Sequence, residues 1–328
     1  MALNFGPVYE MMPSSATGNE RHQKGIPMKR MDVSKLREIF GEENIKTDPS
    51  DLYAFGSDSS VHHAMPWAVV RPDNTEQVQK LMVYANQALI PVIPRGGGSG
   101  MCGQTVPIQG GIVLDMKHMN RILEINMPDV YCRVEPGVVD DDLNLALKSY
   151  GMFYPPTPAS SRIATIGGGI ANNASGVRSV KYGATRDAVL GMKVVLPTGE
   201  LVTLGAHTRV EATGYQLHKL MVGSEGTLGI VVEATLNFVP IPEYRCMGIA
   251  NFDLLADAGA AIGEIMASGA IPSMLELVDS VAIKAVNKTM NLGLKEVAAS
   301  LIFEADGMVK EAVDYEINKM KEICKKHR

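Results

Sequence analysis

The amino-acid sequence predicts an α+β protein built from two domains. A length of 328 residues exceeds that of one small domain and suggests about two. A strand–helix–strand unit and a long strand-rich region fill the first two thirds of the chain, and strands alternate with helices after the prolines of 240–243. The composition, with 46% hydrophobic and 20% charged residues, is that of a globular protein with a large core. We therefore expect one domain over residues 31–242 and a second over 243–328.

The first predicted elements form the strand–helix–strand unit. Residues 1–30 contain scattered prolines and charges without an apolar signal core, so we expect a poorly ordered leader. An amphipathic helix follows at 32–40 and is closed by Gly41. Residues 67–72 are typical of a strand, Asn74 or Thr75 can cap the next helix, and residues 90–94 form a second strand that runs into a glycine-rich loop.

Short strands dominate the region that follows, and they continue to the domain boundary. The expected strands are 111–115, 121–125, 131–134, the hairpin 192–196 and 201–204, and the long run 229–239, with one helix at 140–150. Residues 154–183 are rich in Gly, Pro, Ser and Asn and show no sustained period, which is typical of a functional segment. The second domain is expected to read strand 246–252, helix 254–268, strand 272–278, helix 279–289, strand 299–305 and helix 308–325.

Composition excludes several classes of function. The net charge is −5, no basic run occurs and aromatic residues make up 5%, so we expect no nucleic-acid partner. The four cysteines form no C-x-x-C pair, which favours reduced thiols in a cytoplasmic protein and no metal site. No apolar run approaches the roughly 18 residues that a membrane-spanning helix needs.

The segment P-R-G-G-G-S-G-M-C-G at 94–103 is the strongest local signal. It lacks the lysine of a nucleotide-triphosphate loop. Residues 98–103 match G-x-G-x-x-G, but Pro107 and Gly110 exclude the long helix that a dinucleotide fingerprint requires. Two interpretations stay open from this segment alone: a nest of backbone amides that holds an anion, or a flexible surface loop. Two further glycine-rich patches, at 165–176 and 222–230, favour one extended ligand such as a dinucleotide.

These patches lie within a longer series of motifs that resembles a known family. The motifs include P-V-I-P-R-G-G-G-S-G (91–100), A-T-I-G-G-G-I-A-N-N-A-S-G (164–176), K-Y-G-A-T-R-D (181–187) and V-G-S-E-G-T-L-G-I (222–230). In this order they resemble the flavoproteins of vanillyl-alcohol oxidase and p-cresol methylhydroxylase (PCMH) type, within the branch of cytochrome-linked D-lactate dehydrogenase and the glycolate oxidase flavin subunit. The resemblance implies a two-subdomain PCMH-type FAD-binding domain, followed by an incomplete α+β substrate domain.

The resemblance also implies noncovalent FAD held mainly by backbone amides, because the phosphate loop carries no histidine; Cys102 is the alternative attachment point. Residues 95–101 would wrap the pyrophosphate, the second patch would line the flavin and ribityl side, and the third would meet the adenine half. The implied cofactor-binding residues are Pro94, Arg95, Gly96, Gly97, Gly98, Ser99, Gly100, Met101, Pro136, Gly137, Pro158, Ser161, Thr165, Gly167, Gly168, Asn172, Ala174, Gly226, Gly229 and Ile230.

The implied reaction is oxidation of a small 2-hydroxy acid, such as D-lactate or glycolate, by hydride transfer to the flavin. The metal-binding motif of the branch, H-x-G-D-G-N-x-H, does not occur in this sequence, so the catalytic residues are not identified. Three hypotheses follow: a hydroxy-acid dehydrogenase, a non-catalytic flavin-binding or electron-transfer subunit, and an inactive truncated homologue. We expect an oligomer or a complex, with a C-terminal partner chain or an electron-transfer subunit that could hold the protein at a membrane surface.

Several other polar residues allow both a functional and a structural interpretation. His62 and His63 could bind metal, although a solvated loop is favoured. Arg162 and Arg178 flank the second patch and could steer a carboxylate or serve as surface charge. Glu225 could act as a base, but we expect its carboxylate to accept hydrogen bonds from loop amides.

Overall fold

The computed structural model describes residues 31–327, so the predicted leader lies outside the described residues. The first sheet has four strands in the order β1-β2-β4-β3, in which β2 and β3 run parallel to β4 and β1 is antiparallel to β2. Its elements are α1 (Val33–Phe40), β1 (Ile45–Lys46), α2 (Pro49–Phe55), β2 (Ala68–Val70), α3 (Thr75–Ala88), β3 (Val92–Arg95), β4 (Ile112–Asp115) and the 3-10 helix η1 (Met116–His118).

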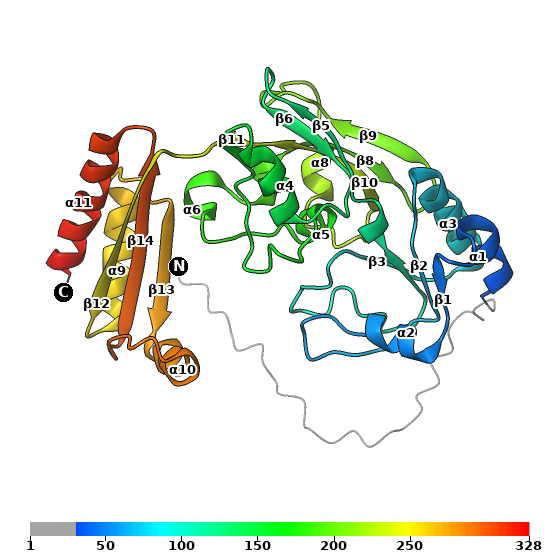
Figure 1. The fold of residues 1–328 in the computed structure, drawn as a ribbon, viewed down its shortest axis with the longest axis horizontal. Helices are drawn as coiled ribbons and strands as arrows, with labels where there is room; N and C mark the ends of the chain where they lie inside the picture. Colours follow the sequence, from blue (N-terminus) through cyan, green and yellow to red (C-terminus); the bar gives the residue numbers. More distant parts are fainter. Residues whose placement is uncertain (1–30, 328) are drawn as a thin grey trace, which may run out of the picture.

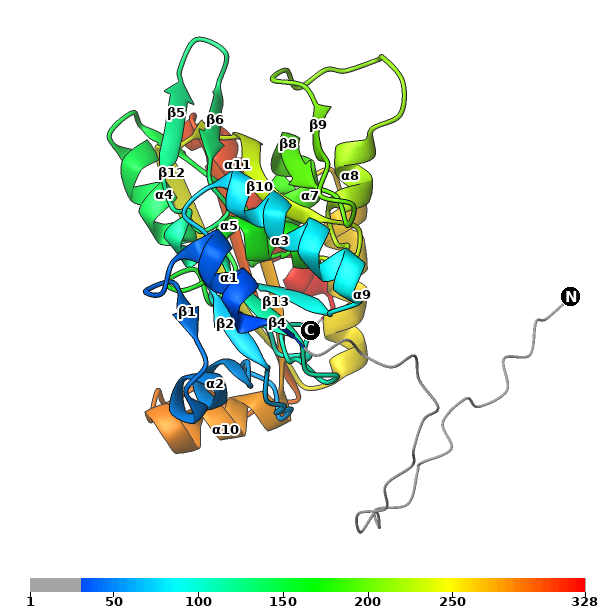
Figure 2. The ribbon, with the colours of Figure 1, turned by 90° about the vertical axis from the view of Figure 1, so that its right-hand side faces the viewer.

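Helix α3 shows why this part of the sequence could be predicted. The side chain of Asn74 caps the helix by accepting a hydrogen bond from the backbone N–H of Gln77 at 3.0 Å. Val78, Leu81 and Ala85 recur at helical spacing and are buried against the first sheet. Figure 2 shows α1 and α3 lying together on this side of the molecule. The strand–helix–strand prediction is therefore confirmed, and β3 leads directly into the glycine-rich loop.

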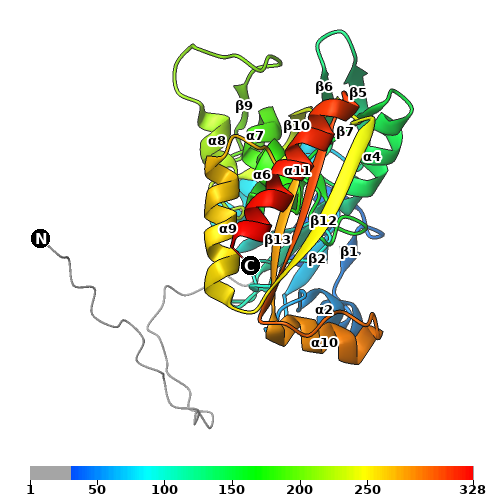
Figure 3. The same ribbon diagram turned by 90° about the vertical axis from the view of Figure 1, so that its left-hand side faces the viewer.

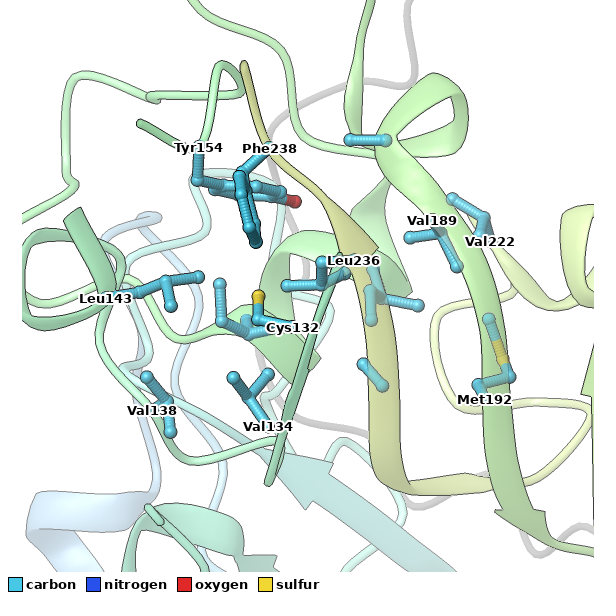
Figure 4. Packing of buried hydrophobic residues seen from close by; sticks show 14 of the residues in the cluster. Cys132, Val134, Val138, Leu143, Tyr154, Val189, Met192, Val222, Leu236 and Phe238 are labelled. Atoms are coloured by element: carbon cyan, nitrogen blue, oxygen red, sulfur yellow. The ribbon is translucent and has the colours of Figure 1, made fainter. Parts of the chain in front are cut away.

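The second sheet has five strands in the order β5-β6-β10-β8-β9, and all neighbours in it are antiparallel. Its strands are β5 (Ile122–Asn126), β6 (Tyr131–Val134), β8 (Val189–Val195), β9 (Leu201–Gly205) and β10 (Ile230–Asn237). The predicted hairpin is confirmed, with Val195 opposite Leu201. One face of the sheet packs on α4 (Asp140–Lys148) and α5 (Ile166–Asn172), and Figure 4 shows side chains of this core.

The segment without sustained periodicity contains short helices as well as loops. It holds α5 and α6 (Ser179–Tyr182), and α7 (Thr185–Ala188) follows. The remaining short elements of this domain are β7 (Met152–Phe153), β11 (Val239–Pro240), which pairs with β7, and α8 (Leu217–Met221). Helix α5 includes three successive glycines, which are poor helix formers. It forms because Thr165 caps it and because Ile166 and Ile170 are buried in the core.

The C-terminal domain is a three-stranded antiparallel sheet in the order β12-β14-β13. Its elements are β12 (Tyr244–Phe252), α9 (Leu255–Ala267), β13 (Met274–Asp279), α10 (Ser280–Met290), β14 (Ala299–Gly307) and α11 (Lys310–Lys326). Helices α9 and α11 cover the outer face of this sheet (Figure 3), and α6 of the first domain lies beside its inner side (Figure 1). The predicted α+β class is confirmed. The predicted boundary after residue 242 stays a prediction, and it lies between β11 and β12.

No helix within residues 31–327 has both the length and the apolar character needed to cross a lipid bilayer. All four cysteines of the sequence lie among the described residues and are unpaired.

Candidate functional site

A cavity lies where the three glycine-rich patches meet, and the space between its walls, which includes open solvent, is about 1070 Å³. Residues from the end of β3, from α5 and from the loop before β10 line it. All but three of the cofactor-binding residues implied by the sequence lie in its wall. The structure therefore gathers segments about 130 residues apart around one concave site, as a ligand that crosses several loops requires.

The three exceptions are Met101, Gly137 and Ser161, which do not line the cavity. Met101 is 78% exposed at the tip of its loop. The backbone N–H of Gly137 donates to the carbonyl oxygen of Met119 at 2.7 Å, which holds this residue against the turn after β4. Ser161 lies in a turn after Pro158, whose carbonyl accepts from its N–H at 3.0 Å. They are neighbours of lining residues in the sequence, but the structure does not place them in the wall.

The loop after β3 presents unused backbone donors. None of the amides from Gly96 to Met101 donates to an acceptor within residues 31–327. The carbonyl of Gly100 instead accepts from the N–H of Ser59 at 3.0 Å, which ties the loop to a second one. Gly98 has a φ of +65°, a left-handed conformation that glycine adopts without strain. A run of free amides in this arrangement fits the predicted anion-binding nest.

Arg95 lies beneath this loop rather than across its mouth. Its Nη1 donates to Thr105 Oγ1 at 3.1 Å, and its guanidinium carbon lies 5.6 Å from the centre of the Phe55 ring. Burial lowers the pKa of the Arg95 guanidinium, whereas the nearby carboxylates of Asp115 and Asp58 raise it. A Cβ atom on Gly98 would overlap this guanidinium, so the glycine lets a buried positive charge approach the loop from behind.

Helix α5 forms the opposite wall of the cavity. The side chain of Thr165 accepts from the Gly168 N–H at 3.3 Å, and the Gly167 N–H donates to the Pro136 carbonyl at 2.8 Å. A Cβ atom on Gly96 would overlap Thr165 Oγ1, so the first patch needs glycine to pack against the second. These contacts fix the first loop, the turn at Pro136 and helix α5 as one rigid frame.

The third patch closes the frame from the side of β10. The N–H groups of Gly223 and Glu225 donate to the carbonyls of Ile170 and Ala171, at 2.9 and 3.0 Å. The expectation for Glu225 is wrong, because its carboxylate makes no hydrogen bond within residues 31–327. Its own backbone amide makes the loop contact, and its φ of +53° turns the chain toward Gly226.

The chemistry of the wall fits a polar ligand that is bound mainly through the backbone. Arg95 and Glu225 are the only ionisable residues among the described residues that line the cavity. The Oε1 atom of Gln104 is buried there without a hydrogen-bond partner, and the amides of the first loop are free. Buried polar atoms are normally satisfied, so this set of donors and acceptors calls for a polar ligand. The unpaired amides suit a pyrophosphate, and the residues present therefore fit FAD.

Sequence reasoning missed part of the wall. The lining residues that were not anticipated are Gln104, Thr105, Met116, Ser160, Ala164, Gly169, Ala171, Met221, Ser224, Glu225 and Val231. Most are immediate neighbours of anticipated residues, so widening each motif by one or two positions would have found them. Met116 and Met221 carry no such signal, because a buried methionine is indistinguishable from core packing in sequence.

The two adjacent histidines belong to an exposed loop. His62 and His63 are both exposed, and the ring of His63 lies 4.6 Å from that of Tyr53, between ring centres. Within residues 31–327 no group of three or more His, Cys, Asp or Glu side chains is arranged to hold a metal ion.

Two family models match the chain. Residues 66–205 match an FAD binding domain, and residues 241–328 match the C-terminal domain of FAD linked oxidases. The frame around the cavity and these matches define the class: this is a flavoprotein whose cofactor is FAD. The chain belongs to the FAD-linked oxidases, as the series of motifs implied.

Curated relatives narrow the comparison further. The chain is 38% identical over 294 residues to the glycolate oxidase subunit GlcD of Bacillus subtilis, a match that covers 89% of this chain and 62% of that protein. It is 38% identical over 278 residues to the mitochondrial cytochrome D-lactate dehydrogenase of Arabidopsis thaliana, covering 84% of this chain and 48% of that protein. The chain thus spans about half to three fifths of the length of these relatives.

Solved structures show the same fold. An alkyldihydroxyacetonephosphate synthase superposes with a TM-score of 0.75 at 24% identity, covering 92% of this chain and 61% of that one. A p-cresol methylhydroxylase superposes with a TM-score of 0.76 at 22% identity, covering 90% of this chain and 63% of that one. At this identity the likeness concerns the fold alone, and it confirms the PCMH type.

Proposed function

We propose that this chain is the FAD-binding part of an oxidoreductase that oxidises a small 2-hydroxy acid, such as D-lactate or glycolate. The observation that carries the proposal is the run of free amides at residues 96–101 in a cavity of the right chemistry, in a chain similar to glycolate and D-lactate oxidoreductases. When bound, FAD supplies the hydride acceptor for such a reaction.

In this proposal the chain's own residues bind and orient. The amides from Gly96 to Gly100 hold the pyrophosphate, and Arg95 adds positive charge from beneath the loop. Residues of α5 and of the loop before β10 hold the remainder of the cofactor. The binding is noncovalent, because no histidine or cysteine of the described residues lines the cavity.

The proposal is tested with the purified chain and added FAD. We expect a yellow protein with an absorbance band near about 450 nm, as flavins show, and release of free flavin on acid denaturation. Anaerobic D-lactate or glycolate should bleach the band. A matched control is 2-hydroxy-2-methylpropanoate, which has the same carboxylate and hydroxyl but no hydrogen to transfer, so it should leave the band unchanged. A chain that stays colourless in excess FAD contradicts the proposal.

A second candidate is a flavin-binding or electron-transfer subunit whose partner completes the substrate site. It is favoured by one observation: the only ionisable residues in the described cavity wall are Arg95 and Glu225. Bleaching that occurs only after a C-terminal partner chain is added would support this candidate. Unpaired cysteines fit a reducing compartment such as the cytoplasm, where an electron-accepting partner could hold the complex at a membrane.

A further inference from the structure

The two domains meet at helix α6 through a buried carboxylate. The Asp306 side chain, at the end of β14, is fully buried. Its Oδ1 lies 2.6 Å from Lys181 Nζ, and the hydroxyl of Tyr182 lies 2.9 Å from both carboxylate oxygens. Lys181 also donates to the Asp306 backbone carbonyl at 2.5 Å. The carboxylate therefore accepts from the Lys181 ammonium and the Tyr182 hydroxyl of α6, and these contacts dock the C-terminal sheet on the FAD-binding domain.

Two further positive charges lie around the same contact. Arg178 precedes α6, and its guanidinium carbon lies 5.3 Å from the centre of the Phe153 ring, which meets the Tyr182 ring edge-on at 5.5 Å. Arg245 lies on β12 directly opposite Asp306. Burial and the hydrogen bond to Asp306 raise the pKa of Tyr182. The positive charges of Arg178 and Arg245 act against this rise in the pKa.

Two cations of this group, Arg178 and Arg245, make no ion pair or hydrogen bond within residues 31–327. Arg178 is half-buried, whereas Arg245 is exposed. Asp306 is the carboxylate at this contact, and it is already engaged by Lys181 and Tyr182. A half-buried guanidinium without a counterion presents its donors to a planar anion such as a carboxylate.

The segment that carries Arg178 starts at the FAD cavity. Ala174 lines the cavity, and Gly176 packs so closely on the Thr157 carbonyl that a Cβ atom there would overlap it. Pro158, the next residue along that strand of chain, also lines the cavity. Arg178 therefore lies in the short segment that joins the wall of the cofactor cavity to α6, and α6 lies beside the inner side of the C-terminal sheet (Figure 1).

We propose that Arg178 is the anchor for the carboxylate of the substrate, at the junction of the two domains. This rests on the proposed function, because it names the part of the protein that recognises the 2-hydroxy acid. Asp306 acts as a positioning residue: by holding Lys181 and Tyr182, it leaves Arg178 as the half-buried donor without a partner. The ligand class is a small monocarboxylate, and the contact would be a charge-assisted, bidentate hydrogen bond.

The test measures binding rather than turnover. The probe is 2-hydroxy-2-methylpropanoate, titrated calorimetrically into the FAD-loaded chain, with 2-hydroxy-2-methylpropanamide as the uncharged match. We expect Arg178→Gln to weaken the carboxylate about 10- to 100-fold, the usual loss when a charge-assisted bond is removed, and Arg178→Lys to weaken it less. Binding of the amide and the affinity for FAD should stay within about twofold. Arg209→Gln, which removes an exposed arginine that does not line the cavity, is the control and should change nothing.

The outcomes separate this proposal from the proposed function. If Arg178→Gln binds the carboxylate as well as the unmodified chain does, or if the unmodified chain does not bind it, the anchor is refuted. Equal losses for carboxylate and amide also refute it, because they indicate a general disturbance. If the anchor holds but neither D-lactate nor glycolate bleaches the flavin, the proposed reaction fails while the carboxylate site stands.

Discussion

The carboxyl group of Asp140 should make the stability of this protein fall as the pH rises. Asp140 begins helix α4, is 2% exposed, and its Oδ2 has no hydrogen-bond partner within residues 31–327. Burial, and to a smaller extent the neighbouring charge of Asp141, raises its pKa to about 7. A position in the first turn of a helix would favour the charged form by up to about 1 kcal/mol, so burial wins at this site.

The size of the effect follows from linkage between proton binding and folding. An ordinary aspartate has a pKa of 3.8, so the unfolded chain releases this proton first, and the folded state is penalised as the pH increases. The stabilisation by the neutral carboxyl is complete below pH 3.8 and is lost as the pH rises to about 7. At roughly 1.4 kcal/mol per pKa unit, the total loss is about 4 kcal/mol, of which about 3 kcal/mol falls between pH 5 and pH 8.

Asp140→Asn keeps the shape of the side chain and removes its titration. In urea unfolding at pH 5, 6, 7 and 8, the unfolding free energy of the variant relative to that of the unmodified protein should increase by about 3 kcal/mol from pH 5 to pH 8. Asp142→Asn is the control, because Asp142 lies in the same helical turn but is exposed. It should lower stability by less than about 1 kcal/mol, equally at each pH. A constant difference between Asp140→Asn and the unmodified protein would refute the assignment of a raised pKa.

Three other substitutions test separate parts of the fold. Gly98→Ala places a side chain at a φ of +65° and against Arg95, so we expect folding stability to fall by about 1–2 kcal/mol. FAD binding, measured by quenching of flavin fluorescence, should weaken at least roughly tenfold, and unchanged binding would exclude the nest. Asp306→Asn leaves Lys181 without its buried counterion, so the free energy of unfolding in urea should fall by about 3 kcal/mol and hydrogen exchange in α6 should become faster. A fall of less than about 1 kcal/mol would contradict the docking role. Gln216 precedes α8 and its side chain does not cap the helix. Gln216→Asp should raise the stability of the protein by about 0.5–1 kcal/mol in thermal unfolding, and no rise would show that the first backbone N–H groups of α8 already have partners.

The first sheet could be predicted because its elements carry local signals. Asn74 is a typical helix N-cap and predicts the start of α3, whose apolar residues recur at helical spacing. Strand β3 ends at a run of glycines. Helix α5 could not be predicted in the same way, because three glycines in seven residues argue against a helix. Its stability comes from burial of Ile166 and Ile170 beneath the second sheet, and contacts of that kind are not visible along the sequence.

The candidate site shows the same division between local and distant causes. Glycines that a nest or a close approach requires are evident in the sequence, so most of the cavity wall was anticipated from residues 94–101, 165–174 and 226–230. The contact between Lys181 and Asp306 joins residues 125 positions apart, and no spacing rule connects them. Glu225 was also mispredicted for this reason: its carboxylate was expected to accept hydrogen bonds, whereas its backbone N–H donates to the carbonyl of Ala171, which is distant in the sequence.

Cofactor binding and substrate recognition should therefore be separable in this protein. The cavity wall offers backbone amides and few charges, so a side-chain substitution outside the loops has little means of disturbing FAD. Recognition of a substrate carboxylate needs a cation, and the proposed one, Arg178, directly precedes helix α6, on which Asp306 docks the second domain. Weakening that contact should loosen substrate binding while the flavin stays bound, because the domain that carries the nest folds around its own core.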